Sequence, residues 1–176
     1  MSEIALMSDT SASTEIIAQS ISEQVVGLPI GQFARLRRLK SGREVRSDHT
    51  VLEMLARAGA PADTWRNQNH FAQWCFVAHA AAVLSGTARR PAHGPGYSFG
   101  AALFRADFAE SRLLRLTAAR GSALFDQARI AIYMIAKSGQ RPVDLTTLKR
   151  LLEDCGVASE NARLLIARRY YDAGRK

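Results

Sequence analysis

The amino-acid sequence predicts an all-α protein, a compact bundle of about eight helices. Apolar residues recur at spacings of three and four along most of the chain, as on the buried stripe of an amphipathic helix. Helix-capping residues and glycines separate these stretches, and no stretch gives a convincing strand pattern. At 176 residues with 47% hydrophobic content, the chain is long enough to bury a core as one domain or as two small lobes.

The N-terminal region begins with a segment, residues 1–12, whose small, polar and uncapped composition predicts a mobile tail. Thr14 precedes the first predicted helix, which ends at Gly27. Pro29 suits the first turn of a second helix that continues to Lys40 and buries Phe33, Leu36 and Leu39.

The middle of the chain contains the longest predicted helix, over residues 63–85, preceded by a helix that Ser47 or Asp48 caps and Gly59 ends. The 63–85 helix is apolar on all sides, which predicts a central, buried position. The Gly- and Pro-rich loop that follows, GTARRPAHGPG, is the predicted joint between two lobes. We therefore expect a single helical domain over residues 13–176, with lobes at about 13–86 and 97–176.

The C-terminal lobe opens with YSFGAALFRADFAESRLLRLTAARGSALFDQAR, which reads as a small-residue turn, a short helix, an arginine-bearing helix and a third helix after Gly121. The isoleucines that follow would suit a strand, but the length and alanine content of the stretch favour a buried helix ending before Pro142. Two more helices are predicted, one capped by Asp144 and running through Asp154, and a last one from Ser159 to Gly174.

The charge distribution indicates a basic body. The net charge is +8, but residues 1–27 hold four acids and no Lys or Arg, so the remainder carries 24 bases against 12 acids. Such a surface typically meets nucleic acid, an anionic membrane or an acidic protein. The first residues lack a signal peptide, the longest apolar run is far too short to span a membrane, and the two cysteines suit reduced thiols. We expect a cytoplasmic protein with no membrane partner.

The four histidines, two cysteines and scattered acids form no complete catalytic pattern. Cys75 and His79 share a helix face, but two ligands do not complete a zinc site, and a buried thiol beside a hydrogen-bonded histidine is favoured. The acids form no magnesium-binding cluster, and no Gly-rich loop precedes a Lys-Ser/Thr pair. We expect no metal, no cofactor and no enzymatic activity.

The arginines of the sequence give the positive evidence for a function. Arg112 and Arg115 lie one turn apart with no acid three or four residues further on, and Arg120 follows at the end of the same helix. Arginine outnumbers lysine, and planar guanidinium groups suit bidentate contacts to phosphate. A solvated face is the alternative for any one residue, since arginine stems also cover apolar surface. As a set they predict salt-dependent, sequence-tolerant binding to nucleic acid.

Four blocks of the sequence stand out by their order and spacing. They are GQFARLRR, HFAQWCFVAHAAA, YSFGAALFRADFAESRLLRL, and PVDLTTLKRLL with ARRYY. Together these blocks resemble the CasB family, the small subunit of the type I-E Cascade CRISPR complex. In order, they are similar to the family's G-x-x-A-x-L-R-R opening, its apolar helix with a central Ala-His, its S-x-G-x-A-L turn with a Glu-x-Arg helix, and its end block. The sequence departs from the family at Leu145, where the family usually has Trp, and at Ser111–Arg112, where it has an Arg pair.

The resemblance implies a two-lobed, non-catalytic protein that sits as a pair of copies against the backbone and large subunits of Cascade. Its basic surface would support the guide RNA and target DNA and hold the displaced non-target strand, stabilising the R-loop in antiviral defence. Matching the family's motifs adds five residues to Arg115 and Arg120 as candidates for nucleic-acid binding: Arg35, Arg37, Arg38, Arg112 and Arg129.

Two other functions remain open from the sequence. The segment TTLKRLLEDCGVASENARLLIARRYY has helix-turn-helix spacing, as in a stand-alone transcriptional regulator that would read DNA through Asn161 or Arg163. Any helix pair with a glycine turn produces such a match. The basic residues would also suit an adaptor that binds an acidic protein.

Overall fold

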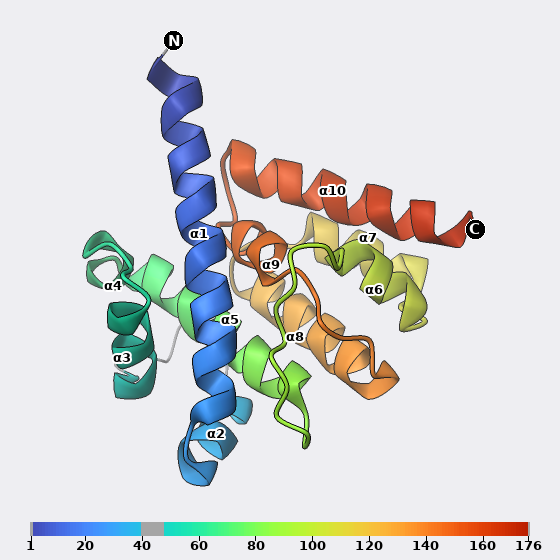
Figure 1. The fold of residues 1–176 in the computed structure, drawn as a ribbon. Coiled ribbons are helices and arrows are strands. Elements are labelled where there is room, and N and C mark those ends of the chain that lie inside the picture. Colours follow the sequence, from blue (N-terminus) through green and yellow to red (C-terminus); the bar gives the residue numbers. More distant parts are fainter. Residues whose placement is uncertain (1, 40–47, 176) are drawn as a thin grey trace.

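The computed structural model describes the backbone of residues 2–39 and 48–175 and the side chains of residues 13–39 and 48–175. Within these ranges the protein has ten helices and no strand, which confirms the all-α prediction (Figure 1). The helices are α1 (Ser2–Gly27), α2 (Ile30–Arg37), α3 (His49–Arg57), α4 (Asp63–Arg66), α5 (Gln68–Ser85), α6 (Phe99–Arg105), α7 (Glu110–Ala118), α8 (Gly121–Ser138), α9 (Leu145–Leu151) and α10 (Val157–Gly174).

Helix α5 lies at the centre of the protein (Figure 1). Every residue from Phe71 to Ser85 is buried, as its all-round apolar composition predicts. It packs against α1, α2, α3 and α4 from the N-terminal half and against α8 and α9 from the C-terminal half. The buried side chains of both halves form one continuous hydrophobic cluster. The two lobes therefore share a core.

Several helix boundaries differ from the sequence-based expectations. Helix α9 ends at Leu151 and not at Asp154, and α10 begins at Val157 and not at Ser159. Helix α1 is helical from Ser2, in place of a tail over residues 1–12 and a start at Thr14, and residues 2–26 contain neither Gly nor Pro to interrupt it. Asn67 divides the predicted 63–85 helix into α4 and α5, because its side chain caps α5 by accepting from the backbone N–H groups of Asn69 and His70. Helix α2 ends at Arg37, while Lys40 lies outside the described residues.

Side-chain caps confirm two of the predicted helix starts. The Asp48 carboxylate accepts from the N–H groups of Thr50 and Val51 at 3.0 and 3.3 Å, while the alternative cap, Ser47, lies outside the described residues. Asp144 accepts in the same way from Thr146 and Thr147 at 2.9 and 3.2 Å. Each carboxylate thus satisfies N–H groups that the first turn of a helix leaves unpaired.

The Gly- and Pro-rich segment between α5 and α6 is held by hydrogen bonds to distant parts of the chain. The Ser22 hydroxyl of α1 accepts from the N–H groups of Ala92 and His93 at 2.7 and 2.9 Å. Val143, just before α9, donates to the Ala92 carbonyl at 2.8 Å and accepts from Gly94 at 3.1 Å. The predicted joint is therefore fastened to α1 on one side and to the start of α9 on the other.

In the C-terminal half, α6 and α10 approach closely at Gly100. A Cβ atom at Gly100 would overlap the carbonyl oxygen of Ile166 and would lie 3.0 Å from the backbone nitrogen of Tyr170. The Tyr170 hydroxyl donates to the Phe108 carbonyl, which joins the C-terminal part of α10 to the segment that leads into α7. This crossing sets the position of the arginine-bearing α7.

Candidate nucleic-acid interface

Helix α8 presents an exposed stripe that joins the basic residues of α2 and α7. Tyr133 is 45% exposed, and its hydroxyl donates to the Arg37 carbonyl at 3.3 Å. One turn earlier, the Arg129 guanidinium donates to the Leu39 carbonyl and lies over the Phe76 ring, 5.8 Å from its centroid. The C-terminal end of α2 is thus fastened along α8.

On α7, Arg112 reaches the same helix. Its Nη1 lies 2.9 Å from the sulfur of Met134, which neighbours Tyr133 on α8. Arg115 is exposed one turn further along α7 and has no hydrogen-bond or ion-pair partner among the described residues. Arg112 of the predicted pair therefore lies against α8, and neither arginine is paired with an acid among the described residues.

Two arginines surround Phe33 of α2. The Arg37 and Arg89 guanidinium carbons lie 5.9 and 4.4 Å from the ring centroid, within the range of a cation–π contact. Arg89 belongs to the segment between the lobes, and the sequence of that segment does not predict its contact with Phe33. Arg38 is exposed, and its Nε donates to the Ala34 carbonyl at 3.2 Å.

We use the name basic face for the surface formed around α8 by these residues. Asp126 is an exposed acid on the same stripe of α8, whereas Lys137 adds a further exposed cation. Cationic side chains therefore predominate over a surface built from three helices and the inter-lobe segment. The face comprises Arg37, Arg38, Arg89, Arg112, Arg115, Arg129, Tyr133 and Lys137.

The guanidinium groups of two other candidates, Arg35 and Arg120, are engaged within the fold. Arg35 pairs with the buried Asp48 carboxylate at 2.7 Å and donates to the Thr50 hydroxyl at 3.0 Å. Arg120 donates to the last carbonyls of α7 and pairs with Glu160 of α10 at 2.8 Å. Both partners come from distant parts of the sequence, so local spacing gave no sign of them.

Beneath the basic face, the buried His79 connects α5 to α2. Its Nδ1 lies 2.8 Å from the Leu36 carbonyl, and its ring packs edge-on against Tyr133. Burial lowers the pKa of His79 from 6.5 to about 4, and the charges of Arg129 and Arg37 act in the same direction, opposing the hydrogen bond to Leu36. The ring is therefore neutral at pH 7 and donates from Nδ1.

The lowered pKa of His79 predicts a pH dependence of stability. The unfolded chain binds a proton near pH 6.5 and the folded protein only near pH 4, so stability is complete above pH 6.5 and falls as the pH drops towards 4. Between pH 7.5 and pH 5 this group should lower the free energy of unfolding by about 2 kcal/mol. Urea unfolding should show a smaller loss in His79→Gln than in the wild type, because only the contribution of the buried His93, whose pKa is also lowered by burial, then remains, with exposed His70→Gln as control. An equal loss in His79→Gln would contradict the assignment.

The predicted helix-turn-helix corresponds to α9 and α10, and its geometry does not suit base reading by Arg163. Arg163 is only 4% exposed, and its Nη1 donates to the Thr117 and Ala119 carbonyls at 2.6 and 3.0 Å. Burial lowers the pKa of its guanidinium. Asn161 is exposed, whereas Arg163 connects α10 to the end of α7 through hydrogen bonds.

Among the described side chains, no group of three histidines, cysteines or acids is arranged to hold a metal ion. Cys75 and His79 are both buried, and burial, followed by the nearby Asp48 charge, raises the pKa of the Cys75 thiol. No helix in the described ranges has the length and hydropathy needed to cross a bilayer.

Comparison with known protein families matches residues 32–171 to the family described as CRISPR-associated protein Cse2. The match covers nearly all of the four sequence blocks that resemble CasB, and it spans α2 to α10. Searches of curated proteins and of solved structures found no match. The chain belongs to the CRISPR-associated Cse2 family, the family also called CasB, and is a subunit of a CRISPR Cascade complex.

Proposed function

We propose that this protein is the non-catalytic small subunit of a type I-E Cascade and binds nucleic-acid phosphates, without sequence preference, through the basic face. The observation that carries the proposal is the joining of arginines from α2, α7 and α8 around one exposed helix stripe. Guanidinium groups on rigid helices suit phosphate contacts and need no base reading.

Modest phosphate contacts suffice for this function. Exchanging a DNA duplex for a guide–target duplex is nearly balanced in free energy, so contacts that hold the displaced strand favour the open R-loop. The ligands would be guide RNA, target DNA and the non-target strand. The protein partners would be the backbone subunits, the large subunit and a second copy of this chain, in a cytoplasmic ribonucleoprotein complex.

A salt titration tests the basic face directly. Binding to single-stranded DNA, duplex DNA and RNA of unrelated sequences would be measured for the wild type and Arg112→Ala/Arg115→Ala. Each lost phosphate contact reduces the slope of log K against log salt concentration by about 0.7 for a single strand, so the double variant should lose about 1.4. The matched control is Arg57→Ala/Arg66→Ala, which removes the same charge from α3 and α4.

Three outcomes would contradict the proposal. An equal reduction in the control variant would indicate attraction to net charge rather than to the basic face. A preference of several orders of magnitude for one duplex would favour the transcriptional regulator. A lack of binding to all three nucleic acids would assign the face to an acidic protein partner.

A further inference from the structure

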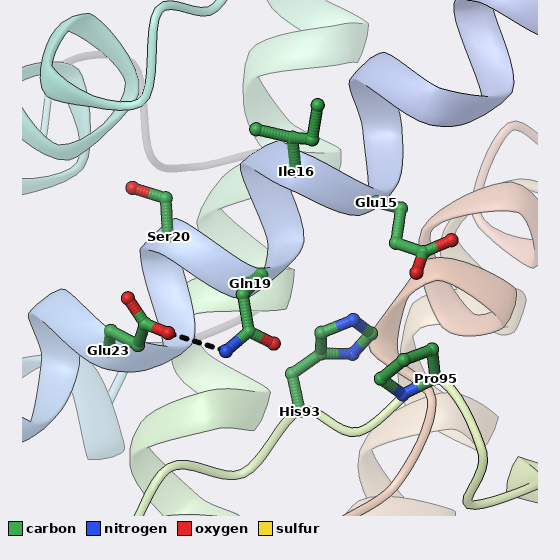
Figure 2. Close-up of a pocket in the computed structure, with 7 residues that line it drawn as sticks. All are labelled: Glu15, Ile16, Gln19, Ser20, Glu23, His93 and Pro95. Atoms are coloured by element: carbon green, nitrogen blue, oxygen red, sulfur yellow. Dashed lines mark hydrogen bonds between the residues drawn. The ribbon is translucent and has the colours of Figure 1, made fainter.

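A groove of about 670 Å³ lies between α1 and the segment that joins the two lobes. One wall is a stripe of α1 with Glu15, Gln19 and Glu23 at successive turns, and the other is formed by His93 and Pro95 (Figure 2). Ile16, which is 63% exposed, and Ser20 complete the lining. The groove shares no residue with the basic face.

His93 carries an unused hydrogen-bond donor on this wall. Its side chain is buried, with only 5% of the residue exposed, and its Nδ1 accepts from the Leu145 N–H at 3.1 Å. The proton of the neutral ring therefore sits on Nε2, which has no hydrogen-bond partner among the residues that the structure describes. Figure 2 shows the imidazole turned towards α1 between Gln19 and Glu15. A buried donor without an acceptor is costly, so a ligand that supplies one is favoured.

The carboxylates of the groove have no cationic partner among the described residues. Within the described part of the chain, Glu23 accepts only from the Gln19 amide, and Glu15 forms no ion pair. The acids lie eight residues apart on one helix, which places them about 12 Å apart along its axis. An extended peptide advances about 3.3 Å per residue, so side chains four residues apart on it match this separation.

We propose that this groove binds an extended segment of a partner protein that carries arginine or lysine side chains flanked by apolar residues. The cationic side chains would pair with Glu15 and Glu23, and a backbone carbonyl of the segment would accept from His93 Nε2. Apolar side chains of the segment would cover Ile16 and Pro95. Charge complementarity selects this occupant: phosphate is repelled by the same carboxylates, and the segment's carbonyls supply the missing acceptor.

A pair of capped peptides tests the proposal with the full-length protein. The probe is arginine-leucine-alanine-leucine-arginine, and its matched control has citrulline at both ends, which keeps the shape and removes the charge. Since the net charge of the protein is +8, a basic peptide is not attracted to it in general. Fluorescence anisotropy gives the affinity, and amide and imidazole NMR shifts give the location.

We expect the arginine peptide to bind at least about tenfold more tightly than the citrulline peptide, with shifts at Glu15, Gln19 and His93. Glu15→Gln/Glu23→Gln should lose at least about tenfold in affinity. Glu53→Gln/Asp63→Asn, which changes the charge equally on α3 and α4, should bind as the wild type does. Equal binding of both peptides, no binding, shifts outside the groove, or equal loss in the control variant would overturn the proposal.

Discussion

Replacing Gly100 with alanine is expected to lower the free energy of unfolding by about 3 kcal/mol or more. The added Cβ would overlap the Ile166 carbonyl oxygen, and it would also lie 3.0 Å from the Tyr170 backbone nitrogen. Both atoms belong to the backbone of α10, which cannot move aside by changing a rotamer. Relief therefore requires α6 and α10 to separate, and this loosens the contacts of the buried Phe99 and Leu103.

Urea unfolding followed by circular dichroism measures this effect, with Gly31→Ala as the matched control. A Cβ at Gly31, near the start of α2, would meet nothing within 4 Å. The control should be neutral or slightly stabilising, because alanine loses less conformational entropy in a helix than glycine does. Equal stability of the two variants would show that α6 and α10 do not cross as closely as described.

Replacing Arg163 with methionine should cost about 3 kcal/mol of unfolding free energy. Methionine keeps much of the length of the side chain but removes the donors to the Thr117 and Ala119 carbonyls. It also removes the cation near Asp154 and Glu160, at 3.8 and 3.5 Å. Among the described residues, the Thr117 and Ala119 carbonyls would keep only the exposed Arg120 as a side-chain donor.

The same measurement separates a structural role of Arg163 from base reading. The control is Arg169→Met, because Arg169 lies on the same helix but is exposed, and its loss should be small. A regulator that reads DNA through Arg163 would instead keep its stability in the variant and lose its preference for one duplex. A fully stable Arg163→Met protein would therefore contradict the structural assignment.

The sequence predicts the helices well because their signals are local. Asp48 and Asp144 cap the helices that they precede, and the apolar composition of α5 predicts its central position. The break at Asn67 was not predicted, although residues 66–70 are all polar, because Asn67 was not recognised as a helix cap. The start of α1 was predicted too late. The small, polar residues at the N-terminus were interpreted as a mobile tail, but such residues are compatible with a helix.

The candidate interface was predictable only in part. The absence of nearby acids along α7 correctly marked Arg115 as free of ion pairs within the described residues. Local spacing does not predict contacts between residues that are distant in the sequence and meet only in the folded protein. Arg120 meets Glu160, forty residues further on, and Arg89 reaches Phe33 from the inter-lobe segment. Whether an arginine is free to bind a ligand therefore depends on the tertiary structure, and not on its neighbours in the sequence.

The central position of α5 has a consequence for how the protein unfolds. Its buried residues contact helices from both halves of the chain, so neither half encloses a complete apolar interior by itself. Detaching either half would expose one side of α5 to water over much of its length, at a cost of about 25 cal/mol for each Å² of apolar surface. The lobes are therefore coupled thermodynamically, and denaturation should proceed as a single cooperative transition rather than lobe by lobe.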